Sequence, residues 1–224
     1  MRESRVAESP REHGTHRGRH GRLFDRDGQS IVMLLTVSGP PGSGKSTTAA
    51  ALAEAFDLEH VSGGDIFREL AAERDMTPVE FNELAEDDDQ IDRDLDRRLR
   101  TVAVERDDVL LESRLAGWLA GDHADLRIWL DAPLDVRCER IVDREDKQLD
   151  QVIEETRRRE SSEAKRYREY YNIHIDDLSI YDLVYNTARW SPEGMLGMLT
   201  TAIDSYDPDT DEGKIPVEGV DYDF

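Results

Sequence analysis

One stretch of the chain combines residue types and spacing suited to phosphate chemistry: Gly39-Pro40-Pro41-Gly42-Ser43-Gly44-Lys45-Ser46. The pattern is that of a phosphate-binding loop, in which glycines let successive backbone N–H groups close around a polyphosphate. A helix that begins at the loop adds partial positive charge at its N-terminus. In this arrangement Lys45 reaches the β- and γ-phosphates of ATP, and the Ser46 hydroxyl ligates Mg²⁺ directly. The alternative interpretation is a glycine-rich turn that contains a lysine by chance.

The sequence on either side of this stretch favours the phosphate-binding interpretation. Residues 31–37 read Ile-Val-Met-Leu-Leu-Thr-Val, a short apolar run with β-branched members that is typical of a buried parallel strand. The residues after the loop are rich in alanine, and Leu52 and Phe56 are four apart, as on one face of a helix. The strand–loop–helix context predicts that Gly39 through Thr47 bind the donor nucleotide.

A second group of polar residues follows the next predicted strand, in the segment Ser62-Gly63-Gly64-Asp65-Ile66-Phe67-Arg68. Asp65 is a candidate N-cap of a helix. Arg68 lies one turn into that helix, where its side chain can fold back toward a phosphate near the helix end. The alternative is that Arg68 is a surface arginine of an acidic protein, and this segment alone does not favour the functional interpretation.

A third group follows the apolar run Val109-Leu110-Leu111, which ends in Glu112. A strand that ends in an acid is typical of a Walker B element, so Glu112 is a candidate to hold Mg²⁺ through water; the alternative is a solvated acid at a strand end. Arg114 comes directly after it. An arginine just past the carboxyl end of a central parallel strand points into the ligand crevice of such a sheet.

Arginines are concentrated between residues 137 and 168, although the chain as a whole is acidic. The planar guanidinium fits phosphate oxygens with two hydrogen bonds, so this concentration favours phosphate binding. Pairing with glutamates four residues away on the same helix explains some of these arginines instead. They are Arg137, Arg140, Arg144, Arg157, Arg158, Arg159, Arg166 and Arg168.

From Met33 onward, short apolar runs alternate with helical patterns, as in a parallel sheet covered by helices on both faces. We therefore expect an α/β protein with the three-layer fold of the NTPases that carry this loop, built on a five-stranded parallel sheet. The predicted strands are residues 32–37, 59–61, 108–112, 126–130 and 182–186.

Local signals mark where helices begin. Thr77-Pro78-Val79-Glu80 is a capping box with proline at the first helical position, so a helix is expected to begin at Pro78. Ser191-Pro192-Glu193 marks the start of the last helix. Another helix is indicated by apolar residues spaced four, four and three apart, namely Ile91, Leu95, Leu99 and Val102.

The composition limits the function classes. Asp and Glu number 51 against 29 Lys and Arg, a net charge of −22, whereas a nucleic-acid binder should carry a basic field. Only four basic residues are lysines, and excess acid with few lysines is typical of proteins of a high-salt cytoplasm; the alternative is an acidic protein of a GC-rich genome.

The single cysteine, Cys138, excludes a disulfide framework and a Cys-based zinc site. No apolar run approaches the roughly 20 residues of a membrane helix, so we expect a cytoplasmic protein without a membrane partner.

The two ends differ from the middle of the chain. Residues 1–32 hold seven Arg, three His and five acidic residues, a net charge of +2 that leaves −24 for the remainder. They are too polar for a secretory signal, and we expect no folded element there. We interpret them either as a basic arm or, as we favour, as residues upstream of a true start at Met33. We expect one domain over residues 33–205 and a mobile acidic tail over residues 206–224.

Several segments together resemble a known family. They are the loop Gly39–Lys45, Val61-Ser-Gly-Gly-Asp-Ile-Phe-Arg68, Arg114-Leu-Ala-Gly-Trp118, Trp129-Leu-Asp-Ala-Pro133, Glu163-Ala-Lys-Arg-Tyr167 and Asp176-Asp-Leu-Ser-Ile-Tyr-Asp-Leu-Val184. On these motifs the chain resembles the nucleoside monophosphate kinases, and most closely the archaeal type of cytidylate kinase. The loop is shared by many folds, whereas the later motifs are specific to the family.

The resemblance implies transfer of the γ-phosphoryl group of ATP, with Mg²⁺, to CMP or dCMP. It implies two small insertions in the fold, one that binds the nucleoside monophosphate at about residues 62–106 and a lid at about residues 140–160. The base preference rests on the resemblance, so an adenylate kinase or a broad-specificity nucleoside monophosphate kinase stays an alternative. The small size and self-contained sheet make a monomer the expected state.

The resemblance also implies roles for residues near the acceptor. Gly63, Gly64 and Asp65 would bind the acceptor nucleotide. Arg68 and Arg114 match the two arginines that hold its phosphate in the family.

Other implied roles concern the lid. The run Arg140-Ile-Val-Asp-Arg144 is similar to the start of the lid in adenylate kinases, whose arginines clamp the donor phosphates. Arg159 and Arg166 resemble the pair after the lid that bridges both substrates. One departure is Ser113, where the family pattern has glycine, and this leaves the local backbone geometry open. The lid near residues 145–150 is short and lacks the cysteines of zinc-bearing lids.

A different class, a nucleotide-dependent switch or a nucleic-acid-associated ATPase, has less support. A GTPase switch should contain an N-K-x-D motif, and Asn186-Thr187 does not provide one. Association with nucleic acid would depend on the basic residues 1–32, against the −24 of the remainder.

Overall fold

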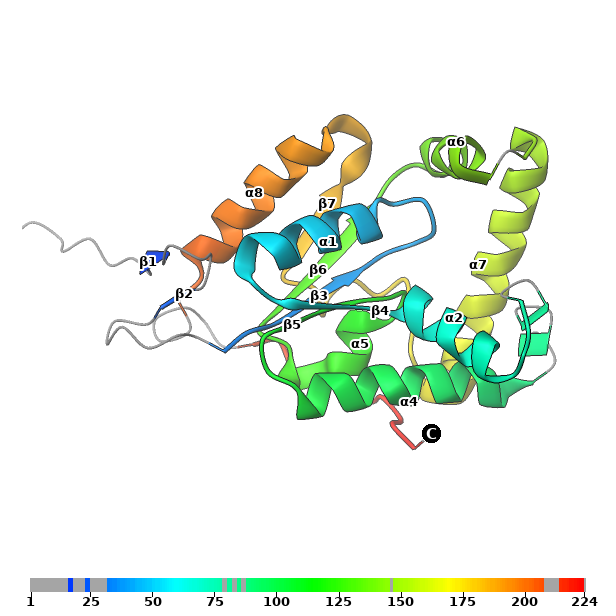
Figure 1. Ribbon diagram of the computed structural model, residues 1–224, viewed down its shortest axis with the longest axis horizontal. Coiled ribbons are helices and arrows are strands. Elements are labelled where there is room, and N and C mark those ends of the chain that lie inside the picture. The colour runs from blue at the N-terminus through cyan, green and yellow to red at the C-terminus, as the bar shows by residue number, and fades with distance from the viewer. Residues whose placement is uncertain are drawn as a thin grey trace, which may run out of the picture.

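The computed structural model describes residues 16–17, 23–24, 32–77, 80–81, 84–85, 88–145, 147–207 and 214–223 (Figure 1). Its centre is a five-stranded sheet in which every neighbouring pair is parallel. The order across the sheet is β4-β5-β3-β6-β7. The strands are β3 (Leu34–Ser38), β4 (Glu59–Ser62), β5 (Val109–Glu112), β6 (Leu126–Asp131) and β7 (Leu183–Asn186). The five predicted strands are confirmed, each to within two residues.

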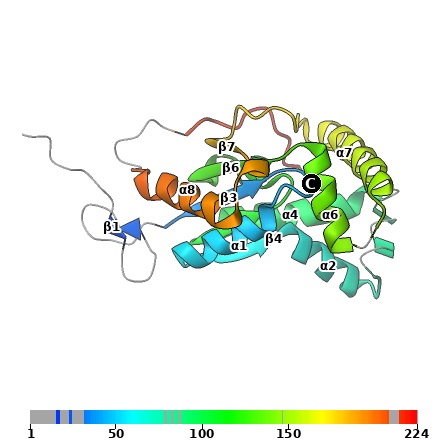
Figure 2. The same ribbon diagram turned by 90° about the horizontal axis from the view of Figure 1, so that it is seen from above.

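Helices cover both faces of this sheet, which confirms the predicted three layers (Figures 1 and 2). Leu35 and Val37 of β3 pack with α1 and α8 in one core, whereas Leu34 packs with α4 and α5 in the other. Alternate residues of a strand point to opposite faces, so an apolar strand can serve both cores. The helices are α1 (Lys45–Phe56) and α8 (Pro192–Ser205) on one face and α4 (Asp89–Glu105) and α5 (Ala116–Ala120) on the other.

Three further helices lie at the end of the sheet where the parallel strands finish (Figures 1 and 2). They are α2 (Gly63–Glu73), α6 (Leu134–Glu145) and α7 (Leu149–Tyr171). α6 and α7 share a small apolar cluster formed by Cys138, Ile141 and Val152, which keeps the two helices together. The chain is completed by the short 3₁₀ turns η1 (Gly121–His123) and η2 (Thr187–Arg189).

The predicted helix signals have their expected geometry. Thr77 and Glu80 exchange hydrogen bonds, with the Thr77 N–H donating to Glu80 over 2.9 Å and the Glu80 N–H donating to the Thr77 hydroxyl over 3.3 Å; Pro78 lies outside the described residues. Ser191 caps α8 by accepting from the Gly194 N–H at 3.1 Å. Ile91 and Leu99 of α4 are fully buried, as their spacing predicts.

The structure also describes parts of the two chain ends. Within the first 32 residues, β1 (His16–Arg17) and β2 (Leu23–Phe24) pair in antiparallel fashion, because backbone hydrogen bonds can form without an apolar pattern. In the tail, residues 214–223 pack on the domain. The Tyr222 hydroxyl donates to the Trp118 carbonyl oxygen over 2.9 Å, and the Asp221 N–H donates to the Tyr171 carbonyl oxygen over 3.0 Å.

The packed part of the tail also covers a buried arginine. The Arg127 side chain, 1 % exposed, donates to the Ile215 carbonyl oxygen, and the guanidinium of Arg100 lies 4.1 Å from the Tyr222 ring centroid. Residues 214–223 are thus part of the packed domain. Among the described residues, no helix is both long and apolar enough to cross a membrane.

Replacing Tyr222 should therefore destabilise the domain. We expect Tyr222→Ala to lower the free energy of unfolding by about 2 kcal/mol, because it removes a half-buried ring, its hydrogen bond and its contact with Arg100. Denaturant unfolding in molar KCl measures the change. Glu218→Ala, an exposed change in the same segment, is the control and should have little effect. Equal stability of the two variants would show that the segment does not contribute to folding.

Candidate active site

The phosphate-binding loop connects β3 to α1, and its backbone requires glycine. Gly42 has φ of 76°, and a Cβ atom there would lie 2.5 Å from the Arg137 carbonyl oxygen. Left-handed φ and this close approach both exclude a side chain. The loop residues Gly39 through Thr47 thus form a tight turn at the carboxyl end of the central strand, which is the end where ligands bind in such sheets.

Lys45 and Ser46 open α1 beside the end of β5. Lys45 Nζ donates to the Pro40 carbonyl oxygen over 3.1 Å. Burial lowers the pKa of Lys45 to about 8; Arg114 and Arg159 add to this lowering, and Glu112 and Glu163 oppose it. Lys45 therefore lies among charged groups from two other elements, as a phosphate-binding lysine should.

Glu112, buried at the end of β5, joins two hydroxyl groups. It accepts from Ser46 Oγ at 3.3 Å and from Ser62 Oγ at 2.9 Å. Magnesium prefers oxygen ligands and is commonly held by one or two protein groups, with phosphates and water completing its shell. The Ser46–Glu112 pair fits that requirement, and within the described ranges no group of three or more His, Cys, Asp or Glu residues could hold a metal alone.

Two of the predicted phosphate-binding arginines meet on one buried carboxylate. Glu163 of α7 accepts from Arg114 Nε at 3.0 Å and from Arg159 Nε at 2.7 Å. Burial opposes ionisation of Glu163, but the two guanidiniums outweigh it and hold the pKa of this carboxyl below its usual value. Arg114 follows β5 and Glu163 lies on α7 with Arg159, so the Glu163 carboxylate connects the end of the sheet to α7.

The segment from Ser62 to Arg68 begins α2 beside the end of β5. The N-cap is Ser62, and Asp65, which was predicted to cap the helix, lies in its first turn. Asp65 instead pairs with Arg68, whose side chain is 61 % exposed. Gly63 and Gly64 are the first two residues of the helix. Asp65 is not the cap because the helix begins three residues earlier than the sequence indicated.

Serine at position 113 causes no backbone strain. Ser113 does not have positive φ, so the glycine of the family pattern is not required for conformation. Its hydroxyl accepts from the Leu115 N–H at 3.2 Å. The Ser113 side chain has room because the residue that faces it, residue 63, is glycine. A Cβ added to Gly63 would lie only 2.9 Å from the Ser113 Cβ. Gly63 thus accommodates the side chain that Ser113 adds.

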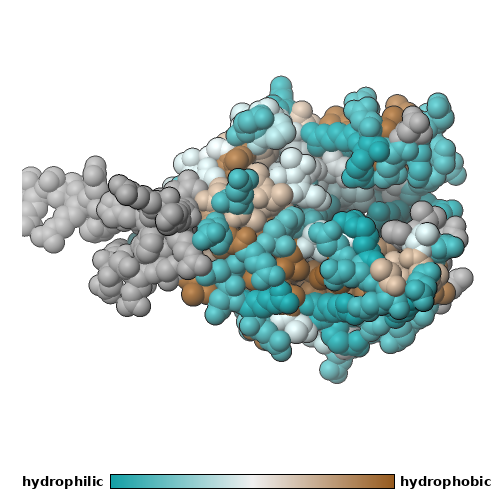
Figure 3. Space-filling model, viewed as in Figure 1, coloured by the Kyte–Doolittle hydropathy of each residue, from teal (hydrophilic) through white to brown (hydrophobic). Residues whose placement is uncertain are grey.

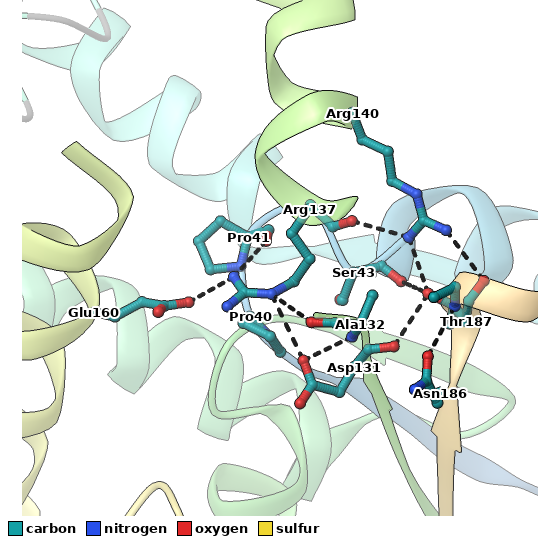
Figure 4. Close-up of polar contacts among 12 residues, drawn as sticks. Pro40, Pro41, Ser43, Asp131, Ala132, Arg137, Arg140, Glu160, Asn186 and Thr187 are labelled. Carbon is teal, nitrogen blue, oxygen red and sulfur yellow. Dashed lines mark hydrogen bonds and ion pairs between the residues drawn. The ribbon is translucent and has the colours of Figure 1, made fainter. Parts of the chain in front are cut away.

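Arg137 and Arg140 of α6 hold the outer side of the phosphate-binding loop (Figure 4). Arg137 Nη1 donates to the Pro41 carbonyl oxygen over 3.0 Å, and Arg140 Nη1 donates to the Gly42 carbonyl oxygen over 3.2 Å. Arg140 also donates to the hydroxyl and carbonyl oxygens of Thr187, at 2.9 and 3.1 Å. The buried Arg137 was not among the predicted site residues; the signal was its spacing of three from Arg140, which puts both on one helix face.

The remaining predicted arginines lie apart from the Glu163 pair. Arg144, 68 % exposed, pairs with its neighbour Glu145 at 2.8 Å. Arg166 Nε pairs with Asp92 of α4 at 2.7 Å. The structure therefore brings Arg114 and Arg159 together beside Lys45, and gives Arg140, Arg144 and Arg166 other partners. The space-filling view shows the surface hollowed, with largely hydrophilic residues, between the parts over α6 and over α2 (Figure 3).

The fold and this site define a phosphotransferase of the class that binds nucleotides with a glycine-rich loop. The solved structures that resemble it support the fold. An uncharacterized protein from Eubacterium ventriosum has a TM-score of 0.60 at 17% identity, covering 78% of this chain and 99% of its own. A shikimate kinase from Bacteroides thetaiotaomicron has a TM-score of 0.55 at 18% identity, covering 77% and 99%.

The sequence comparisons identify the family. A model of the cytidylate kinase-like family matches residues 34–189. Curated relatives described as cytidylate kinase include those of Halorubrum lacusprofundi, 69% identical, and Haloquadratum walsbyi, 68% identical, each over 86% of this chain and 100% of the relative. The chain belongs to the cytidylate kinase-like family.

The shared carboxylate should be important for stability. We expect Glu163→Gln to lower the free energy of unfolding by about 2–4 kcal/mol, because Arg114 and Arg159 lose the charge that compensates them. Added sulfate should recover more of this stability in the variant than in the wild type, because an anion can replace the carboxylate. Denaturant unfolding with and without sulfate measures both effects.

Glu169→Gln is the matched control, since Glu169 is an exposed partner of Lys165 on the same helix. We expect a change of less than about 1 kcal/mol for it. If both variants lost the same stability, the bridge between the two arginines would not be the cause.

Proposed function

We propose that this chain transfers the γ-phosphoryl group of ATP to CMP or dCMP, with Mg²⁺. The observation that carries the proposal is the convergence of Lys45, Arg114 and Arg159 at the carboxyl end of the sheet, with Glu163 between the arginines. The relatives described as cytidylate kinase, at up to 69% identity over 86% of the chain, support the choice of acceptor.

The chemistry requires little from the protein beyond positioning and charge. A phosphate oxygen of the acceptor attacks the γ-phosphorus, the bond from that phosphorus to the bridging oxygen breaks, and ADP leaves. The attacking oxygen is already an anion, so no general base is needed. Mg²⁺, held by Ser46 and through water by Glu112, would neutralise charge on the donor phosphates.

The arginines have different tasks in this proposal. Arg68 and Arg114 hold the acceptor phosphate, and Arg159 and Arg166 bridge the two substrates. Arg144, exposed at the end of α6, reaches the donor phosphates when the lid closes and excludes water, which would otherwise compete as acceptor. Arg140 holds the loop that cradles those phosphates.

The organisation of the chain follows from this assignment. We infer that residues 62–106 form the part that binds the nucleoside monophosphate and that residues 140–160 form the lid. We further infer a cytoplasmic monomer that acts without nucleic acid or membrane.

A coupled assay of ADP release in molar KCl tests the proposal, with ATP·Mg²⁺ and each of CMP, dCMP, UMP, AMP and GMP. We expect CMP and dCMP to be preferred. Preference for AMP would instead indicate an adenylate or broad-specificity kinase. ATP turnover that no acceptor stimulates would reject the class and favour the nucleotide-dependent switch.

Replacing Arg68 should raise the KM for CMP more than the KM for ATP. We expect Arg68→Ala to raise the KM for CMP by about 10- to 100-fold, the equivalent of one charge-assisted hydrogen bond, and to leave the KM for ATP within a factor of about three. Arg106→Ala is the control, because Arg106 is a similarly exposed arginine that pairs with Glu59. Equal changes for the two substrates would contradict the acceptor role.

The lowered pKa of Lys45 predicts how ATP binding depends on pH. Above a pKa of about 8 the free protein has a neutral Lys45, so binding of a polyphosphate must take up a proton. ATP affinity should therefore fall as pH rises above 8, approaching about tenfold per pH unit, and calorimetry in two buffers should show proton uptake. Lys45→Arg stays charged and should lose this pH dependence. A wild-type affinity that is constant from pH 7.5 to 9.5 would contradict the prediction.

A further inference from the structure

The C-terminal residues 214–223, here called the strap, lie on the side of the sheet that α4 and α5 cover (Figure 1). The first half of the strap is attached to the sheet and to η1. The Ile215 carbonyl oxygen accepts from the buried Arg127 of β6. The Val217 N–H donates to Asp122 Oδ1 over 3.0 Å, and the Val217 side chain packs against the apolar core on this side.

The second half of the strap holds the C-terminal end of α7. The last carbonyl groups of a helix have no partner within the helix. The Tyr171 carbonyl oxygen accepts instead from the Asp221 N–H of the strap, at 3.0 Å. Asn172, the C-cap of α7, donates through Nδ2 to the Gly219 carbonyl oxygen over 2.9 Å. The turn at Gly219 has a left-handed φ of 74°, which glycine adopts without strain. The strap thus connects the end of α7 to the sheet.

This end of α7 is near the residues that are proposed to act on the phosphates. Glu163, which joins Arg114 and Arg159, comes eight residues before Tyr171, about 12 Å along the helix axis. The two positions belong to one continuous helix, so a change in its angle at Tyr171 displaces Glu163. A misplacement of about 1 Å can lower the rate of a reaction by about 100-fold. Attachment of the strap therefore affects the site through α7.

The charge of the C-terminal region opposes this attachment at low salt. Residues 206–224 contain seven acidic residues and one lysine, a net charge of −6, and −16 remains for the rest of the chain. Repulsion between exposed carboxylates acts over a Debye length of about 10 Å at 0.1 M salt and about 3 Å at 1 M. The partly exposed pair of Lys214 and Asp125, at 3.2 Å, opposes this effect, but such pairs contribute little. Hydrogen bonds to carbonyl groups and apolar contacts are not screened in this way, so salt favours the attached strap.

We propose that the strap positions α7 for phosphoryl transfer and detaches when the salt concentration is too low to screen its negative charge. When it detaches, α7 loses two hydrogen bonds at its C-terminal end, and Glu163 orients Arg114 and Arg159 less precisely. The inference rests on the proposed function and adds a salt-dependent control of the same site. The competing explanation is that the strap only stabilises the fold.

The test measures attachment and activity separately in the full-length chain, from low to molar KCl. Amide hydrogen exchange reports attachment through the N–H groups of Val217 and Asp221, and it reports the integrity of the core through β3. Kinetics with ATP·Mg²⁺ and CMP give kcat and both KM values at the same KCl concentrations. A role in stability alone would not change kcat while β3 stays protected.

Three variants are compared with the wild type. Tyr222→Ala weakens the strap by removing its contacts with α4 and α5. The double variant Asp221→Asn, Asp223→Asn removes two negative charges from the strap, and asparagine keeps the acceptor that residue 221 offers to the N–H of residue 223. The matched control is Glu54→Gln, Glu193→Gln, which removes two exposed charges from α1 and α8 on the other face of the sheet. Thermal unfolding checks that each variant is folded at the assay temperature.

As KCl decreases, we expect the strap of the wild type to lose protection before β3 does. Over the same range kcat should fall about tenfold, and the KM for ATP should change by less than about threefold. The Asp221→Asn, Asp223→Asn variant should shift both transitions to lower KCl, because less charge needs screening. Tyr222→Ala should shift both to higher KCl, and the control should keep both where the wild type has them.

The outcomes separate this inference from the proposed function. If no acceptor stimulates ATP turnover at any KCl concentration, the proposed function fails and the positioning role fails with it. If CMP is phosphorylated and kcat stays constant where the strap has lost protection and β3 has not, the positioning role alone is overturned. Loss of protection in the strap and β3 together, in every protein, would show that the strap does not detach separately. Equal shifts in the two double variants would reject the charge of the strap as the cause.

Discussion

The site depends on a buried carboxylate, Glu163, that lies between positively charged side chains. Lys45, Arg114 and Arg159 come from three different elements, and without compensation their mutual repulsion would oppose packing. Glu163 accepts from both arginines, and its own burial is tolerable because two charge-assisted hydrogen bonds accompany it. The carboxylate therefore fixes the positions of both guanidiniums. Under the proposed function, a phosphate would meet arginines that are already oriented, which would reduce the ordering that binding must otherwise include.

This arrangement also suits the acidity of the chain. The chain has a net charge of −22, so its surface carboxylates repel one another. At molar salt the Debye length is about 3 Å, and the salt screens most of that repulsion. Buried pairs are screened much less, so the Glu163 bridge keeps its strength under the same conditions. The relatives from Halorubrum and Haloquadratum are consistent with such conditions. Salt therefore weakens the repulsion at the surface much more than it weakens the Glu163 bridge.

The features that were predicted correctly are those that a short segment of sequence determines. The loop, the strands and the capping residues Thr77 and Ser191 are each recognised within a few residues of chain, and the structure has them where expected. The partners of the arginines could not be predicted, because they come from segments distant in sequence. Arg140 contacts the loop at Gly42, and Arg166 pairs with Asp92 of α4. Tail packing was missed for a related reason: Tyr222 is a lone aromatic residue in an acidic segment and produces no periodic pattern.

The arginines around the site divide into two on α6 that hold the loop and two on α7 that pair with carboxylates. Arg137 and Arg140 bind backbone oxygens of the loop, so their geometry is fixed by α6 and does not depend on substrate. α7, in contrast, carries Arg159 and Glu163 beside Arg114, and Arg166 beside Asp92 of α4. A rigid helix cannot move at one end without moving at the other. A displacement of α7 would therefore disturb the Glu163 bridge and the Arg166–Asp92 pair together, whereas the contacts of Arg137 and Arg140 with the loop would depend on α6 alone.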